Sequence, residues 1–365
     1  MSTTRSTQHG LPAIDGRRRK KRAAMRVTVI GGAGYVGSLL VERLLERGTE
    51  VTVMDALMFG GEALRTLTDH PALTFVHGDL RDIEAVVRAC AGADAVVHLG
   101  AVVGDPACAL DEAATLTINR DATITTARVA RALGVRRFVF ASTCSVYGAS
   151  DELLTEDSEL APISAYARSK AESEALLLPM SGSDFHPTVL RFGTLFGQSR
   201  RDRFDLVVNL LAARAVIDGE IRINGGDQWR PFVHVADCVD AILACLEAPE
   251  TVVTGRVFNV GSDALNRTLR DVGEMIRDLL PDVQVVFGES AAAEANYRVS
   301  CARIATELGF HPTRTLSDGI IEIQDAVRAG MVTDYTDPRY SNFQSLVTGR
   351  SSLDVVQPAV EAGVG

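Results

Sequence analysis

The sequence predicts an α/β fold with a doubly wound parallel sheet and a smaller, partly interleaved C-terminal α/β lobe. From Met25 onward, short apolar runs alternate with segments of helical periodicity, which is typical of a parallel sheet covered by helices on both faces. Three glycines follow the first apolar run and open the first helical segment, and an acidic residue ends the second run. Together these observations indicate a Rossmann-type fold.

The first strand is expected at 27–30, and the helical segment 36–47 that follows it ends at Gly48. Further strands are expected at 51–54, 73–76, 95–99, 137–141, 188–192 and 256–260, with helices at about 112–133 and 164–178. After Gly197 the alternation loosens. There we expect helices at about 204–217, 232–247, 268–280 and 301–308, and strands near 220–223 and 283–287, which predict the smaller lobe.

The composition suits a globular enzyme of one large or two closely joined domains. The 365 residues are 46% hydrophobic and 23% charged. No apolar run reaches the roughly 18 residues that a membrane span needs, and we expect no signal peptide and no membrane partner. The six cysteines are scattered without a CxxC pair, which indicates reduced thiols, a cytoplasmic location and no metal site.

The net charge of −10 hides a basic N-terminal stretch. Residues 1–24 carry seven Arg or Lys side chains, most of them in the run 17–22, and one acid, Asp15. We interpret 1–24 as a disordered basic leader, because such runs are usually solvated, with binding of a polyanion as the alternative. The rest of the chain is strongly acidic, which argues against nucleic acid as the main partner.

The stretch IGGAGYVG, Ile30 to Gly37, has the spacing of a phosphate-binding turn, with glycines at 31, 34 and 37. Glycine lets a diphosphate approach the backbone N–H groups at the helix N-terminus, where the helix dipole favours an anion. Asp55 ends the second strand, where a carboxylate can accept hydrogen bonds from both hydroxyls of an adenosine ribose and would repel a 2′-phosphate. The sequence therefore predicts NAD, rather than NADP, as the cofactor.

Tyr166 and Lys170 lie four residues apart at the start of an expected helix, so their side chains share one face. A phenol with a pKa near ~10 is a poor base at neutral pH. A neighbouring ammonium and an oxidised nicotinamide would stabilise the phenolate and lower that pKa. The pair can then remove the proton of an alcohol while hydride leaves its carbon.

With these motifs the sequence resembles the extended short-chain dehydrogenase/reductase superfamily, in its nucleotide-sugar epimerase/dehydratase branch. The resemblance covers roughly residues 25–325 and rests on GGAGYVG, HGDLRD, HLGA, STCSVYG, YARSK, RFGTLFG and WRPFVHVADCVDAI. It implies a tightly held NAD, a nucleoside-diphosphate sugar as substrate and a homodimer. We expect an NAD-binding domain over 25–187, a mixed region with the substrate-binding lobe over 188–332, whose segments return in part to the first domain, and a C-terminal tail over 333–365.

The resemblance also implies two groups of site residues. The cofactor site would comprise Gly31, Gly34, Tyr35, Val36, Gly37, Asp55, Asp79, Leu80, Leu99, Ala101, Asn119 and Lys170. The substrate site would comprise Thr143, Cys144, Ser145, Tyr166, Thr194, Asn209, Arg230 and Arg298. Asp79 would hydrogen-bond the adenine amino group, or cap the helix expected to start near Arg81.

The stretch STCSVYG, residues 142–148, separates the branches of the family. Thr143 stands where the family has a Ser or Thr that hydrogen-bonds the reacting sugar hydroxyl, and the alternative is that it only satisfies backbone groups at a strand end. The family's 4,6-dehydratases carry an Asp and a Glu at the next two positions, and its decarboxylases a Glu at the second. Cys144 and Ser145 stand there, and neither a neutral thiol nor a hydroxyl drives water elimination easily.

At the substrate end, Arg230 matches the arginine of the family's R-D-F-V-H-V motif and would bind the diphosphate or the nucleoside, although Pro231 replaces the usual Asp. Asn209 would contact the diphosphate and Arg298 would close over it. Thr194 stands where galactose 4-epimerases carry Asn, so the sugar contact there differs. Two other features have plainer interpretations: His98 as a satisfied core histidine rather than a catalytic one, and 104–106 as a turn, with contact to the sugar as the alternative.

The function predicted from these residues is NAD-dependent epimerisation of a nucleotide sugar. Thr143, Tyr166 and Lys170 would be the catalytic residues. A ketoreductase is the close alternative, and a 4,6-dehydratase would need an acid from elsewhere in the chain. A non-catalytic dinucleotide sensor or scaffold of the same fold is a further alternative, disfavoured because both Tyr166 and Lys170 are present.

Overall fold

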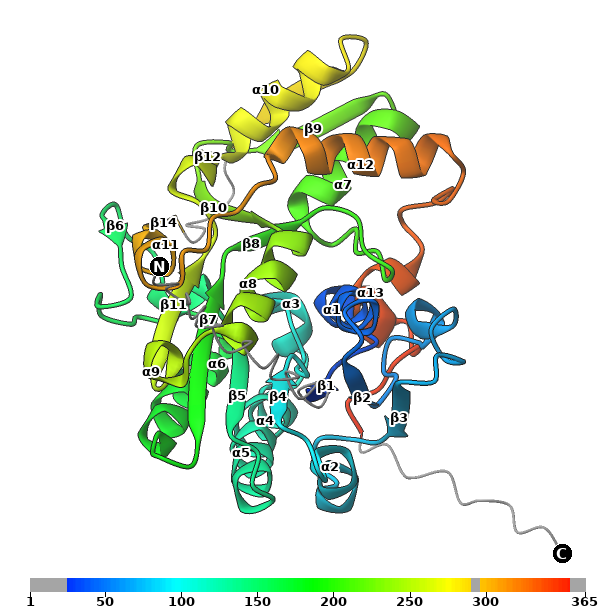
Figure 1. The fold of residues 1–365 in the computed structure, drawn as a ribbon. Helices are drawn as coiled ribbons and strands as arrows, with labels where there is room; N and C mark the ends of the chain where they lie inside the picture. The colour runs from blue at the N-terminus through cyan, green and yellow to red at the C-terminus, as the bar shows by residue number, and fades with distance from the viewer. Residues whose placement is uncertain (1–24, 290–295, 355–365) are drawn as a thin grey trace, which may run out of the picture.

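The computed structural model describes residues 25–289 and 296–354, so the expected leader, 1–24, and the end of the expected tail, 355–365, lie outside the described residues. A seven-stranded parallel sheet in the order β11-β7-β5-β4-β1-β2-β3 forms the centre (Figure 1). The strands are β1 (Arg26–Ile30), β2 (Glu50–Asp55), β3 (Leu73–His77), β4 (Ala95–His98), β5 (Arg137–Thr143), β7 (His186–Phe192) and β11 (Arg256–Val260). The predicted doubly wound fold is confirmed.

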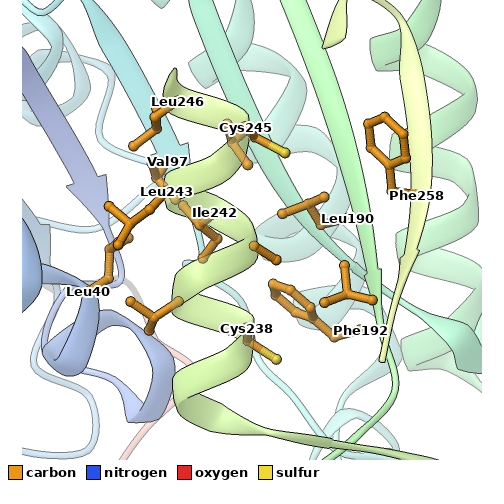
Figure 2. Packing of buried hydrophobic residues seen from close by; sticks show 14 of the residues in the cluster. Leu40, Val97, Leu190, Phe192, Cys238, Ile242, Leu243, Cys245, Leu246 and Phe258 are labelled. Carbon is orange, nitrogen blue, oxygen red and sulfur yellow. The ribbon is translucent and has the colours of Figure 1, made fainter. Parts of the chain in front are cut away.

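Helices cover both faces of this sheet. One face carries α1 (Tyr35–Glu46) and α8 (Val235–Glu247), and the other carries α2 (Ile83–Cys90), α5 (Ala122–Ala132) and α6 (Ala165–Leu177). Figure 2 shows α8 lying along the sheet, with Cys238 beside Phe192 and Leu243 toward Leu40 of α1. Burial of such apolar side chains stabilises the layers by about 1.5–3 kcal/mol for each large residue.

The helix expected over 112–133 is divided. It consists of α4 (Glu112–Leu116), a π-helical turn (Thr117–Asp121) and α5. In the turn, the Asn119 side chain is fully buried and hydrogen-bonds both the N–H and the carbonyl of Val102 at 2.8 Å. The turn therefore fastens this helical stretch to the loop that follows β4.

The smaller lobe has its own apolar core. This core lies between α7 (Val207–Ile217), α10 (Leu269–Leu279), α12 (Leu316–Arg328) and the parallel pair β9 (Glu220–Asn224) and β13 (Gln284–Gly288). A three-stranded sheet connects the lobe to the rest, with strands β8 (Thr194–Phe196), β10 (Trp229–His234) and β12 (Asn266–Thr268). The remaining short elements are α3 (Asp105–Cys108), β6 (Leu153–Leu154), α9 (Glu250–Val253), β14 (Arg298–Val299), α11 (Ala302–Leu308) and α13 (Asn342–Val347). None of the helices in the described ranges is long and apolar enough to cross a membrane.

Residues 333–354 lie against both parts of the molecule. After α12, in the upper lobe of Figure 1, the chain returns to the level of α1 and forms α13. Phe343 and Leu346 of this segment pack against a buried cluster that includes Val102 and Cys108. The segment expected as a tail is therefore folded onto the sheet domain over its described part.

A buried ion pair joins α6 to the edge of the sheet where β5 and β7 end. Arg191 of β7 donates to Glu174 of α6 with an Nη2–Oε2 distance of 2.6 Å, and the side chains are only 5% and 2% exposed. Ser142 at the end of β5 also donates to Glu174, and Arg191 donates to the Tyr147 hydroxyl at 2.8 Å. Tyr147 in turn donates to Asn259 of β11 at 2.7 Å. The network holds one helix against three strands.

We predict that Glu174→Gln lowers the free energy of unfolding by about 3–5 kcal/mol, because it leaves the Arg191 charge buried without its partner. Urea unfolding followed by circular dichroism measures the change. Asp184→Asn is the control, since it breaks the exposed pair that Asp184 forms with Arg131 and should change little. Equal shifts in the two variants would contradict the role assigned to the buried pair.

Candidate active site

A cleft with a volume of about 400 Å³ lies at the carboxyl ends of the central strands. Its walls come from the glycine-rich turn, the loops after β2, β4 and β5, the start of α6 and the segment between β7 and α7. The predicted site residues that line it are Gly31, Gly34, Tyr35, Val36, Gly37, Asp55, Asp79, Leu80, Leu99, Ala101, Thr143, Ser145, Tyr166, Lys170 and Thr194. The structure thus brings the glycine-rich turn, the tyrosine–lysine pair and the end of β5 into one cleft.

The glycine-rich turn has no room for larger side chains. Gly31 has φ +79°, and a Cβ there would lie 2.7 Å from the backbone nitrogen of Gly100. A Cβ on Gly37 would lie 2.1 Å from the carbonyl oxygen of Gly31. The turn therefore packs closely against β4 and directs the N-terminus of α1 into the cleft, where an anion is favoured.

Asp55 lies at the end of β2 beside this turn. Its carboxylate accepts hydrogen bonds from the backbone N–H groups of Ala33 at 2.9 Å and Leu57 at 2.8 Å. Burial raises the pKa of Asp55, and these two hydrogen bonds oppose that shift. The carboxylate thus fixes the turn and still lines the cleft where the sequence predicts an adenosine ribose. A glycine cradle closed by an acid at the end of β2 fits NAD, for which no metal ligand is required.

Asp79 lies further along the cleft wall, and its carboxylate is held by Arg81. The guanidinium donates to the two oxygens at 2.9 and 2.7 Å. The expectation that Asp79 caps the following helix is wrong, because α2 begins at Ile83 and Asp82 accepts from the backbone of Glu84 and Ala85. Asp79 therefore lines the cleft and does not cap α2.

Thr143, Tyr166 and Lys170 converge from two elements. Thr143 ends β5, and Tyr166 and Lys170 are one turn apart in α6, whose N-terminus is capped by Ser164 accepting from Ala167 N–H. The Lys170 ammonium donates to the carbonyl of Ala141 at 2.8 Å and is 2% exposed. This bond fixes the lysine between α6 and β5, on the cleft side.

Burial raises the pKa of Tyr166 above its usual range, with the nearby Cys108 thiol and Asp105 carboxylate acting in the same direction. The Arg203 guanidinium and a hydrogen bond with Thr143 lower it. Desolvation lowers the pKa of Lys170 to about 8. Lys170 is not among the groups that act most strongly on Tyr166, so its expected effect on the phenol stays a prediction.

Five predicted site residues do not line the cleft. Cys144 points into the core, where its thiol donates to the Arg191 carbonyl at 3.2 Å and burial raises its pKa. Asn119 is bound to Val102, as described above. Asn209 is 1% exposed and bonds Gly197 N–H at 2.9 Å. The contacts of these three side chains are therefore structural, and their assignment to cofactor or substrate stays a prediction.

The two predicted substrate arginines also lie off the cleft wall. Arg298 donates to the carbonyl of Asp151 at 2.8 Å, and its guanidinium lies 5.3 Å from the centre of a Trp229 ring. Arg230 donates to the Trp229 carbonyl at 3.0 Å and has a further partner. Neither side chain lines the cleft, although the Arg230 charge lowers the pKa of the cleft residue Tyr297, and the assignment of both arginines to the substrate diphosphate stays a prediction.

His98 is a core histidine, as expected, but it is not satisfied. It lies on β4 with its ring near those of Phe138 and Phe140, at centroid distances of 5.8 and 5.9 Å. Neither ring nitrogen has a hydrogen-bond partner within the described residues. Desolvation lowers its pKa to about 3, so the ring is neutral and has no evident part in proton transfer.

Sequence reasoning missed several cleft residues, namely Phe59, Arg201, Arg203, Tyr297 and Asn342. Tyr297 is 4% exposed, lies 3.4 Å from the Ser145 hydroxyl and has its pKa raised to about 12 by burial. Asp105, expected as part of a plain turn, accepts from Ser164 at 2.7 Å. The run SRRDRFD, 199–205, directly after the Gly197 turn, was the available signal for two cations near the site.

Comparison with known proteins identifies the class. Residues 27–261 match the model of the NAD dependent epimerase/dehydratase family, and the chain belongs to this family. A dTDP-glucose 4,6-dehydratase of Streptomyces griseus is 32% identical over 304 residues, which cover 80% of this chain and 90% of the relative. A UDP-glucose 4-epimerase of Corynebacterium glutamicum is 29% identical, over 82% of this chain and 94% of the relative.

Solved structures agree with the family. A UDP-glucuronic acid 4-epimerase from Bacillus cereus, in complex with UDP-glucuronic acid and NAD, is similar with a TM-score of 0.75 and 25% identity, over 84% of this chain and 99% of that one. The dTDP-glucose 4,6-dehydratase DesIV from Streptomyces venezuelae, with NAD bound, has a TM-score of 0.74 and 28% identity, over 84% and 97%. The predicted family is confirmed, and epimerases and dehydratases both occur among the relatives.

Proposed function

We propose that the protein is an NAD-dependent epimerase that acts on a nucleoside-diphosphate sugar. The observation that carries the proposal is the convergence of Thr143, Tyr166 and Lys170 on one cleft with the glycine-rich turn, while the position after Thr143 holds a buried thiol, Cys144. The set suffices for reversible oxidation of a secondary alcohol. It lacks the paired carboxylates that water elimination uses at 144 and 145 in the dehydratases that the sequence resembles.

The chain's own groups would move one proton and orient one hydroxyl. Thr143 holds the sugar hydroxyl, and Tyr166 as phenolate takes its proton as the carbinol becomes a ketone. Bound NAD supplies a reversible acceptor for the hydride that leaves the carbinol carbon. Once the keto sugar has turned in the cleft, its opposite face would meet the reduced dinucleotide, and Tyr166 would give its proton back to the oxygen. Lys170, fixed to Ala141, supplies the positive charge beside this exchange.

A 4,6-dehydratase is the second candidate, because one cleft carboxylate could act as the missing acid. Asp105 lines the cleft and its charge raises the pKa of both Tyr166 and Tyr297, so it lies near the reacting groups. The other two cleft carboxylates, Asp55 and Asp79, are held by backbone N–H groups and by Arg81. A dehydratase function would therefore depend on Asp105 as the acid.

We expect purified protein to interconvert epimers of a nucleotide sugar without added cofactor. Incubation with a panel of nucleotide sugars and chromatography with mass detection measures this. Tyr166→Phe should lower the rate by about 10²–10⁴-fold, the usual effect of a general base. Tyr335→Phe, which alters a tyrosine outside the cleft, is the control. A product lighter by one water would favour the dehydratase. Net consumption of NADPH in a parallel incubation with that cofactor would favour a ketoreductase.

We predict that the rate of the oxidation step falls as the pH rises above about 8, since the pKa of Lys170 is lowered to about 8. Below that pH the ammonium is present, and above it the side chain becomes neutral and no longer stabilises the phenolate. Stopped-flow absorbance of the reduced nicotinamide after mixing with substrate measures the rate. A rate that stays constant up to pH ~10, the ordinary pKa range of a lysine, would refute this role of Lys170.

We also propose a homodimer in the cytoplasm. The six cysteines are free and buried, which supports a reducing compartment. Exposed apolar side chains at Ile163 and Leu176, beside and within α6, support an apolar contact between copies. Light scattering coupled to size-exclusion chromatography should give twice the chain mass of 39.1 kDa. A single chain mass at micromolar concentration would count against the dimer.

A further inference from the structure

Over residues 25–289 and 296–354, no carboxylate forms an ion pair with Arg201, a cation in the cleft wall. It lies in the segment between β8 and α7, and its guanidinium lies 4.7 Å from the centre of the Phe59 ring. One nitrogen, Nη2, donates to the Asn342 amide oxygen at 2.8 Å. Its Nε is buried and has no hydrogen-bond partner among the residues that the structure describes. The side chain therefore has a free donor and an unneutralised charge in the cleft wall.

The surrounding charges make this position costly. Desolvation and the like charge of Arg203 together lower the pKa of Arg201 to about 10, although Asp205 and Asp55 oppose the shift. Arg203 is already paired with Asp205 through two hydrogen bonds of 2.9 Å. A partly buried cation that forms no ion pair of its own is stabilised when a ligand brings further negative charge.

The C-terminal segment holds Arg201 in this position. Asn342, at the start of α13, is 1% exposed; its backbone N–H donates to Asp205 at 3.1 Å and its amide nitrogen to the Val103 carbonyl at 3.3 Å. Further along, the Leu353 carbonyl accepts from Arg81 at 2.9 Å. The segment thus connects the loop that carries Arg201 to the loops after β3 and β4, on the dinucleotide side of the cleft.

We propose that Arg201, positioned by Asn342, binds the diphosphate of the dinucleotide from the wall segment that packs beside the start of α1. Its neighbours are Phe59 and Asp55, at the end of the cleft where the adenosine ribose is expected, and Arg203, which lies toward Tyr166. A guanidinium between these two ends faces the middle of the cofactor, and its planar donors match phosphate oxygens. The inference rests on the NAD binding that the proposed function requires.

The test compares Arg201→Gln with Arg200→Gln by calorimetric titration of protein stripped of bound nucleotide. Arg200 is the matched control, because it is adjacent in the chain but is paired with Glu42 and bonds the Ala63 carbonyl outside the cleft. Arg201→Gln should weaken NAD and ADP by about 10–100-fold, the effect of one or two charge-assisted hydrogen bonds, and leave adenosine affinity unchanged. Arg200→Gln should leave all three affinities unchanged.

Asn342→Ala tests the positioning role. It should weaken NAD and ADP by a smaller factor, roughly threefold to tenfold, again without a change for adenosine. A merely structural role would weaken adenosine equally and so would overturn the proposal. Unchanged ADP affinity in Arg201→Gln would overturn the proposal too. So would a loss of affinity for NADP alone, which would indicate a contact with the 2′-phosphate. A loss of affinity for UDP alone would also overturn it, because Arg201 would then bind the substrate diphosphate. Since these are binding measurements, a protein that passes them but forms no epimer would refute only the proposed function.

Discussion

The geometry of the cleft depends on a buried ion pair, in which Arg191 and Glu174 neutralise each other's charge. Both side chains are nearly inaccessible, and each has further hydrogen bonds, so neither charge is left alone. A buried pair of this kind adds little net stability compared with apolar packing, but loss of one partner is severe. Its effect here is positional: α6 can dock on the ends of β5 and β7 in only one arrangement.

That arrangement sets the proposed chemistry. α6 carries Tyr166 and Lys170, and the end of β5 carries Thr143, so a shift of the helix along the sheet would separate the phenol from the hydroxyl that orients the substrate. The bond from Lys170 to Ala141 fixes the same two elements a few residues away. Two buried polar contacts, made by Lys170 and Glu174 about one and two turns along α6 from Tyr166, therefore define the distance between base and substrate more strictly than apolar packing alone would.

Sequence patterns predict those features of the fold that depend on interactions between residues close together in the chain. The seven strands follow from apolar runs of the right length, and the turn around Gly31 follows from steric limits within a few residues. The helix α12 was missed, although Thr315 and Asp318 form a capping box ahead of an apolar stripe. By contrast, Arg230 and Arg298 match or adjoin family motifs, yet their side chains turn to Trp229 and Asp151. The contact between Arg298 and Asp151 joins segments 147 positions apart, and no spacing rule contains it.

The same distinction separates the two halves of the cleft. The wall formed by the glycine-rich turn and Asp55 is closed by bonds between residues close in sequence or on adjacent strands, and its ligand could be predicted. The other part of the wall depends on Arg201 and Asn342, 141 positions apart, which meet only because the chain after α12 folds back over the sheet domain. A cofactor clamped between a wall fixed early in the chain and one completed by its last folded segment would be retained until that segment moves. Tight retention of NAD, which an epimerase that must return the same hydride requires, would then depend on the C-terminal segment as much as on the glycine-rich turn.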